Sequence, residues 1–207
     1  MSKPLLHVKN LAVFRGEHCV FAGLDFQLFS GEILQLHGDN GSGKTTLLRA
    51  LCTLLPLEQG VIFWRGESLP GARARFFTEM IYSGHSEAIK SDLSPRENLI
   101  AGAALRGSAD VDIDSILVRV GLTGKADLPC RLLSAGQRRR VTLARLLTSR
   151  TALWILDEPL TSLDMDGRSL VEKLITGHAV DGGAVIYTTH QPLNLEGCEV
   201  RSLKMGH

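Results

Sequence analysis

The most informative stretch of the sequence is a run of eight residues with the spacing G-x-x-x-x-G-K-[ST]. An apolar, strand-like segment (33–37) precedes the run and a helix-like segment (46–51) follows it. Glycines allow a tight loop whose backbone N–H groups converge on phosphate oxygens, and the N-terminus of the next helix adds positive potential. The motif therefore predicts a site for a nucleoside triphosphate, the alternative being a glycine-rich turn with a chance lysine. The residues of the run are Gly38, Asp39, Asn40, Gly41, Ser42, Gly43, Lys44 and Thr45.

Within this motif we expect Lys44 to reach the β- and γ-phosphates and the Thr45 hydroxyl to ligate Mg²⁺. We take the nucleotide-binding segment to end at Thr46. A second candidate group, Asp157 and Glu158, follows the apolar stretch 152–156, which is typical of a strand buried inside a parallel sheet.

These two carboxylates are expected beside the phosphate-binding loop, because ligands of parallel sheets bind at the carboxyl ends of the strands. Asp157 would hold Mg²⁺, usually through water, and Glu158 would orient or deprotonate the attacking water. The alternative is a pair of acidic residues that only caps a turn at the end of the strand.

The elements that must position these residues alternate between strands and helices, which predicts an α/β fold with a covered parallel sheet. Strands are expected at 80–83, 152–156 and 184–187, in addition to the strand before the loop. The N-terminal stretches 5–11 and 21–29 are typical of an antiparallel hairpin. The fold class is therefore a P-loop nucleoside triphosphatase with an N-terminal antiparallel β region.

A mostly helical pattern extends from about residue 73 to residue 148. Two capping boxes, Ser94–Glu97 and Ser134–Gln137, each predict the start of a helix within it. We interpret this region as a helical lobe inserted into a single domain of 207 residues. The core would then comprise residues 1–72 and 149–207, and the lobe residues 73–148.

Composition limits the possible functions and locations. The formal net charge of +1 gives no reason to expect a nucleic-acid partner, and the basic run Arg138–Arg140 is interpreted as a solvated helix face. The four cysteines are widely spaced, which suggests neither a zinc site nor disulfides. The longest apolar stretches are as short as strands, and the start resembles no secretory signal, so we expect a cytoplasmic protein. Any work at a membrane would go through partners.

A resemblance to a known family enters at Leu133–Gln137, which is similar to the L-S-G-G-Q signature of ATP-binding-cassette (ABC) ATPases. Ala135 stands in place of a glycine, and Gly136 is retained. The resemblance implies that this helix start binds the γ-phosphate of ATP held by a second subunit, through Ser134, Ala135, Gly136 and Gln137. Taken alone, the pentapeptide would fit a simple helix cap better than a nucleotide-binding signature.

Two further motifs follow in the order of this family. Asp164, in Ser162-Leu163-Asp164, is at the distance of the D-loop from the strand-end carboxylates, and His190 follows the strand at 184–188 like the switch histidine that contacts the γ-phosphate. Two positions depart from the family pattern. His85 stands where a glutamine usually senses Mg²⁺ and faces the membrane partner, and Arg15 stands where an aromatic residue usually stacks on adenine. A guanidinium can stack in the same way.

Within the family, the segment Thr188-Thr189-His190-Gln191-Pro192-Leu193 and the short length resemble the ATP-binding subunits of the bacterial cytochrome c maturation system, a haem exporter. This resemblance implies an ATPase that works in a head-to-tail pair with transmembrane subunits, peripheral on the cytoplasmic side of the inner membrane. Its MgATP hydrolysis would support delivery of haem. The alternatives are an ABC transporter with another substrate and, in a different class, a soluble ABC-type ATP switch.

Overall fold

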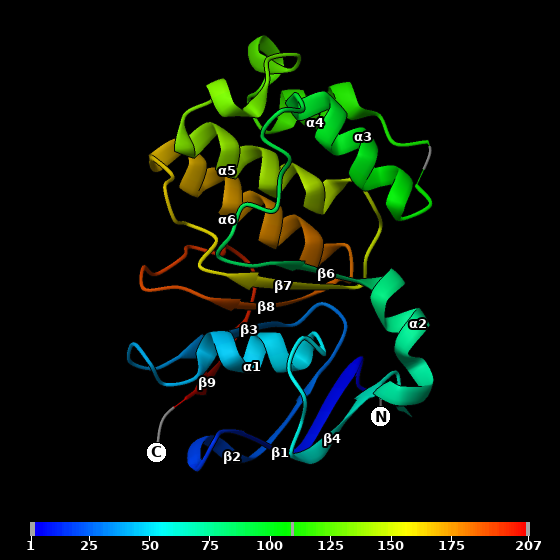
Figure 1. Ribbon diagram of the computed structural model, residues 1–207, viewed down its shortest axis with the longest axis vertical. Helices are drawn as coiled ribbons and strands as arrows, with labels where there is room; N and C mark the ends of the chain where they lie inside the picture. The colour runs from blue at the N-terminus through cyan, green and yellow to red at the C-terminus, as the bar shows by residue number, and fades with distance from the viewer. Residues whose placement is uncertain (1–2, 109, 206–207) are drawn as a thin grey trace.

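The computed structural model describes residues 3–108 and 110–205, and within these residues the strands form two sheets (Figure 1). The five-stranded sheet has the order β6-β7-β8-β3-β9, and all its neighbouring strands pair in parallel, as predicted. Its strands are β3 (Ile33–His37), β6 (Met80–Ser83), β7 (Leu153–Asp157), β8 (Ala184–Thr188) and β9 (Val200–Lys204).

The second sheet is antiparallel and has the order β2-β1-β4-β5. The predicted hairpin is confirmed: β1 pairs with β2 from Leu6 opposite Leu28 to Arg15 opposite His18. The bounds of the strands are β1 (Leu6–Arg15), β2 (His18–Leu28), β4 (Gln59–Trp64) and β5 (Glu67–Ser68).

Helices cover both faces of the parallel sheet. Figure 1 shows α1 on the face toward the antiparallel sheet, and α6 and α5 on the other face, with α3 and α4 farther out. In the described residues, no helix is both long enough and apolar enough to cross a membrane. The helices are α1 (Lys44–Leu51), α2 (Leu69–Glu79), α3 (Pro95–Leu105), α4 (Ile113–Arg119), α5 (Ala135–Ala144) and α6 (Met165–Val180), with short 3₁₀ turns at Thr123–Lys125, Cys130–Leu132 and Arg145–Leu147.

The parallel sheet is buried on both faces, and its side chains alternate between two hydrophobic clusters. In β7, Leu153 and Ile155 belong to the cluster formed with α1 and the antiparallel sheet, whereas Trp154 and Leu156 belong to the cluster formed with α6 and the helical lobe. This alternation follows from the two-residue period of a strand. It explains why β7 is apolar throughout and ends at the first polar residue, Asp157.

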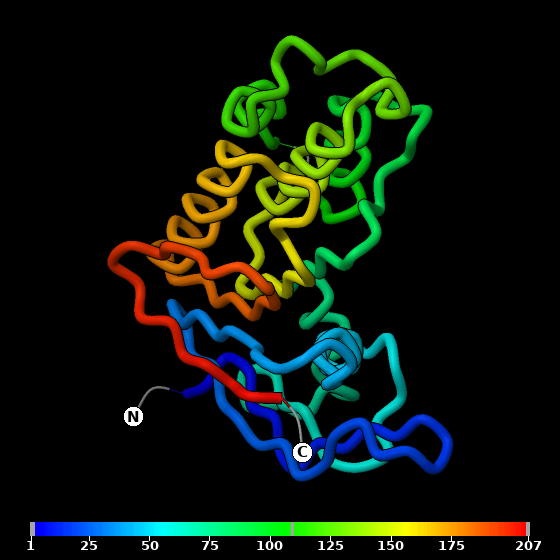
Figure 2. The backbone as a smooth tube through the Cα atoms, turned by 90° about the vertical axis from the view of Figure 1, so that its left-hand side faces the viewer, coloured from blue at the N-terminus to red at the C-terminus, as the bar shows by residue number. Residues whose placement is uncertain are grey.

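The boundary of the helical lobe differs from the predicted start at residue 73. Phe76 of α2 packs edge-on against Trp64 of β4, with ring centroids 5.2 Å apart, and β6 pairs with β7 inside the parallel sheet. Residues 73–83 therefore belong to the core, and the lobe begins after β6. A helical pattern does not reveal which layer a helix covers, so sequence alone merged α2 with the helices of the lobe. Figure 2 shows the lobe at one end of the molecule and the N-terminal strands at the other.

Candidate functional site

A cavity of about 650 Å³ opens beside the loop between β3 and α1, a size suited to a nucleotide. The structure brings most of the predicted site residues to its walls: the loop 40–46, both strand-end carboxylates, His190 and Arg15. His18 and Val20 of β2 also line it, and the sequence did not single them out. Both lie at the start of β2, directly after the turn that follows Arg15.

The loop requires glycine at two positions for steric reasons. A Cβ on Gly38 would lie 2.5 Å from the Met205 carbonyl oxygen, and one on Gly43 would lie 2.8 Å from Cγ1 of Val20. Gly43 is also the N-cap of α1, with φ of 92°, and offers no side chain to the first N–H groups of the helix. These N–H groups are therefore available to an anion.

Lys44 is folded over this loop. Its Nζ donates to the carbonyl oxygens of Gly38 at 2.7 Å and of Asp39 at 2.9 Å, and its side chain is buried. Close to it, the buried hydroxyl of Ser42 has no hydrogen-bond partner among the described residues. A buried cation beside unused donors is an arrangement suited to phosphate oxygens.

The strand-end carboxylate Asp157 is fixed by two hydroxyl groups. Thr45 Oγ1 donates to its Oδ1 at 3.2 Å, and Thr188 Oγ1 donates to the same atom at 2.8 Å. Asp157 is only 2% exposed. The Thr45 hydroxyl and the Asp157 carboxylate are hard oxygen donors next to the phosphate-binding loop, so the two fit a magnesium site.

Glu158 and His190 face each other in the wall of the cavity. His190 Nε2 lies 3.4 Å from Glu158 Oε1, which is buried and otherwise has no hydrogen-bond partner in the described structure. Glu158 has φ of 49°, so its backbone lies in the left-handed region that L-residues rarely adopt. A carboxylate in this position can accept a proton from a water molecule.

The signature residues lie elsewhere in the same chain. Ser134 and Gln137 form the predicted capping box, in which Gln137 N donates to Ser134 Oγ at 3.2 Å and Ser134 N donates to Gln137 Oε1 at 3.0 Å. With Gly136 and Asp164 they line a second cavity of about 450 Å³, which shares no lining residue with the first. Ala135 is exposed on the same helix turn.

Asp164 is the N-cap of α6, and its carboxylate oxygen also lies 3.3 Å from Arg140 Nη2. The hydrogen bond from Gly167 N, followed by the charge of Arg140, holds the pKa of Asp164 below its usual value. His85 is exposed in the linker between β6 and α3, outside both cavities. Its expected role stays a prediction.

The basic run on α5 does not form a solvated face, and that interpretation is corrected. Arg139 is only 3% exposed, whereas Arg138 and Arg140 are partly buried and make ion pairs with Glu87 and Asp164. The signal was present in the sequence, since Arg139 precedes Leu143 by four residues and lies on the apolar face of the helix. Burial lowers the pKa of the Arg139 guanidinium.

The site and the fold together define an ATP-binding subunit. They comprise a P-loop, a pair of carboxylates at the end of a strand and a separate capped helix start, on a parallel sheet with an inserted helical lobe. The sequence pattern of the family described as ABC transporter matches residues 21–161. The chain therefore belongs to the ABC transporter family, and to the ATPases within it. A solved structure of an ABC transporter ATP-binding protein from Pyrococcus furiosus shares this fold, with a TM-score of 0.81 and 25% identity over 97% of this chain and 96% of that one.

More specifically, the chain is similar to the cytochrome c biogenesis ATP-binding export protein CcmA. The CcmA of Dechloromonas aromatica (strain RCB) is 47% identical over 98% of this chain and 100% of its own length. The CcmA of Hahella chejuensis (strain KCTC 2396) is also 47% identical, over 98% of this chain and 96% of its own.

Proposed function

We propose that this chain hydrolyses ATP to drive the export step of cytochrome c maturation, in which haem is delivered for covalent attachment outside the cytoplasm. The observation that carries the proposal is the meeting of the phosphate-binding loop, Asp157, Glu158 and His190 in one cavity. The similarity to CcmA proteins over nearly the whole chain supports the particular transport role.

ATP would bind with its phosphates against the loop 38–46. The backbone N–H groups at the start of α1 and the Lys44 ammonium would hold the β- and γ-phosphates, and Ser42 would add a hydroxyl donor. Arg15, which lines the same cavity, would stack on the adenine, with Val20 packing beside it.

Hydrolysis would be carried out by residues in the wall of the same cavity. Glu158 would orient the attacking water and accept its proton, and His190, which lies against the same carboxylate, would donate to the γ-phosphate. Thr45 and Asp157 would hold Mg²⁺, which when bound neutralises phosphate charge. The two threonine hydroxyls on Asp157 keep this carboxylate in one orientation before substrate arrives.

The second cavity gives a reason to expect a head-to-tail pair of chains. Ser134, Gly136 and Gln137 present a capped helix start to solvent, away from the loop of the same chain. In a pair, this helix start would face the γ-phosphate bound by the partner. Transmembrane subunits would bind such a pair on the cytoplasmic side of the membrane, and His85 in the linker is our candidate for sensing their position. The protein would then be peripheral on the inner membrane.

The test uses cells that lack the gene and are complemented with the wild type or with Glu158→Gln. C-type cytochromes are stained for covalently bound haem, and the purified proteins are assayed for ATP hydrolysis and ATP binding. We expect Glu158→Gln to bind ATP, to hydrolyse it at least one hundred-fold more slowly and to leave cytochromes without haem. Mature cytochromes in cells without the gene would exclude the export role, whereas full hydrolysis by Glu158→Gln would exclude the proposed base.

A further inference from the structure

Arg139 of α5 is a buried cation that contacts the segment after β7. Its Nη2 donates to the carbonyl oxygen of Glu158 at 2.7 Å, and its Nε donates to that of Pro159 at 3.2 Å. Its Nη1 reaches the carbonyl oxygen of Gly84, in the linker after β6, at 3.4 Å. One guanidinium therefore joins α5, the linker and the backbone of the proposed catalytic glutamate.

This arrangement depends on the shape of arginine. A buried charge is costly unless its donors are hydrogen-bonded, and no salt bridge joins Arg139 to a carboxylate within the described residues. The planar guanidinium carries five N–H donors in a fixed fork, so it can serve several carbonyl oxygens at once. Lysine has a single ammonium at the same position and could not reach oxygens on both segments in this way.

Glu158 is the residue that this contact holds in place. Its φ of 49° is a strained conformation for a residue other than glycine, and it persists only where the surroundings fix it. Its N–H donates to Thr188 Oγ1 at 3.0 Å, and its carbonyl oxygen accepts from Arg139. Both peptide groups that flank Glu158 are thus held, one from β8 and one from α5.

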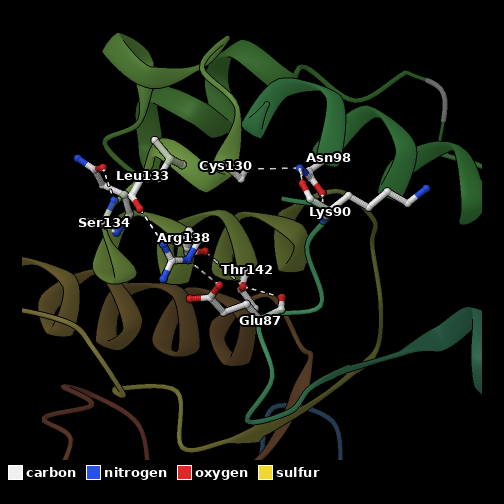
Figure 3. Close-up of polar contacts among 9 residues, drawn as sticks. Glu87, Lys90, Asn98, Cys130, Leu133, Ser134, Arg138 and Thr142 are labelled. Atoms are coloured by element: carbon white, nitrogen blue, oxygen red, sulfur yellow. Dashed lines mark hydrogen bonds and ion pairs between the residues drawn. The ribbon is translucent and has the colours of Figure 1, made fainter. Parts of the chain in front are cut away.

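Three other polar residues of α5 and of the turn after it bind the linker rather than Glu158 and Pro159. Arg138 pairs with the Glu87 carboxylate at 2.9 Å, and Thr142 donates to the Glu87 carbonyl oxygen at 2.8 Å (Figure 3). Arg145 donates to the Ala88 carbonyl oxygen at 2.7 Å. These three residues hold the linker to α5, so Arg145 offers a matched control for the loss of a linker contact.

We propose that Arg139 is a positioning residue, which fixes the backbone of Glu158 so that its carboxylate faces the attacking water, and which ties that geometry to the helical lobe. This inference rests on the proposed role of Glu158 as the catalytic base. A shift of about 1 Å at a reacting group can cost on the order of one hundred-fold in rate.

The experiment compares the ATPase kinetics of Arg139→Met, Arg145→Met and the wild type. Arg139→Met is expected to lower kcat by about ten- to one hundred-fold while KM for ATP stays within about three-fold. Arg145→Met is expected to keep kcat within about three-fold, because it loses only a linker contact. A wild-type kcat in a folded Arg139→Met, or an equal loss in Arg145→Met, overturns the proposal. If Arg139→Met does not fold, Arg139→Lys replaces it with the same criteria.

A second comparison separates this inference from the proposed role of Glu158. In the Glu158→Gln background, Arg139→Met should cause no further loss of single-turnover hydrolysis, because the residue acts through Glu158. A further loss of the same factor would mean that Arg139 acts independently and would overturn the inference. Wild-type hydrolysis by Glu158→Gln alone would refute the catalytic role itself, whatever Arg139→Met does.

Discussion

The Lys44 side chain is placed to bind an anionic ligand. Its ammonium is buried against two carbonyl oxygens of its own loop, and those oxygens cannot neutralise its charge. We expect Lys44→Met to weaken ATP binding by at least about ten-fold, since a charge-assisted hydrogen bond contributes about 1.5–3 kcal/mol. Equilibrium titration with a fluorescent ATP analogue measures this. Lys125→Met, at an exposed lysine, is the control and should bind as the wild type does; equal affinity in both variants would contradict the prediction.

The phosphate-binding and carboxylate residues could be identified from the sequence because their function can be recognised from the residues adjacent to them in the chain. The glycines and Lys44 form one run, and Asp157 and Glu158 end one apolar strand. Arg139 and Thr188 were missed because their roles depend on contacts with β7, from which they are separated by 18 and 31 residues. The pattern on α5 places Arg139 on the apolar face, yet it does not reveal which carbonyl oxygens accept its hydrogen bonds in the folded chain.

At the scale of elements, two helices begin with the same capping box but serve different surfaces. Ser94 caps α3 inside the lobe and is buried, whereas Ser134 caps α5 at the second cavity and is exposed. Replacement by alanine should cost about 1 kcal/mol of unfolding free energy at either position. We expect ATPase activity to survive Ser94→Ala and to fall in Ser134→Ala. Denaturant unfolding and steady-state hydrolysis, measured together, check this; equal activities would argue against a role for Ser134 beyond the cap.

The contact between α6 and β7 should make stability depend on pH. His178 stacks on Trp154, with ring centroids 3.9 Å apart and planes 6° from parallel, and burial lowers its pKa from 6.5 to about 4. Between pH 4 and pH 6.5 the unfolded chain binds more protons than the folded chain. The contribution of neutral His178 to the stability of the fold is therefore complete above pH 6.5 and is lost as the pH falls toward 4. This contribution to the free energy of unfolding has an upper limit of about 3 kcal/mol. The actual value is smaller, because the ring is only partly buried and solvent screens its charge.

Thermal unfolding of the wild type and of His178→Phe from pH 7 to pH 4.5 measures this dependence. The variant keeps a ring against Trp154 but has no group to titrate, so its stability should fall less over this range. Parallel curves for the two proteins would show that His178 does not carry the dependence.

Helices and strands could be predicted where the local sequence pattern determines them. Both capping boxes and the buried strand β7 are confirmed, because caps and apolar runs are local signals. The assignment of α2 to the core was not predictable, since it depends on the contact between Phe76 and Trp64 and on the place of β6 in the sheet. Such contacts join segments whose relative placement only the folded chain defines.

At the scale of the whole molecule, the two cavities lie on separate parts of one chain, and each holds part of what hydrolysis is proposed to need. The first is lined by the loop 40–46 and Glu158, and the second by Ser134 and Gln137. Two chains arranged head to tail would complete both sites, because each chain would make the same contact with the other. Such a pair has the closed two-fold symmetry that most homodimers adopt. ATP should therefore link the two subunits, and dimer formation should depend on both nucleotide and protein concentration.

Sedimentation of Glu158→Gln with ATP tests this arrangement, because slow hydrolysis keeps the nucleotide in place. We expect the mass to rise from that of one chain, 22.5 kDa, to twice that value as protein concentration increases, and to stay at one chain without ATP. Adding Ser134→Arg should keep the protein monomeric, since the larger side chain fills the second cavity, whereas adding Ser94→Ala should not. A Glu158→Gln protein that binds ATP and remains monomeric at every concentration would contradict the head-to-tail pair. Dimers that tolerate Ser134→Arg would place the interface away from the start of α5.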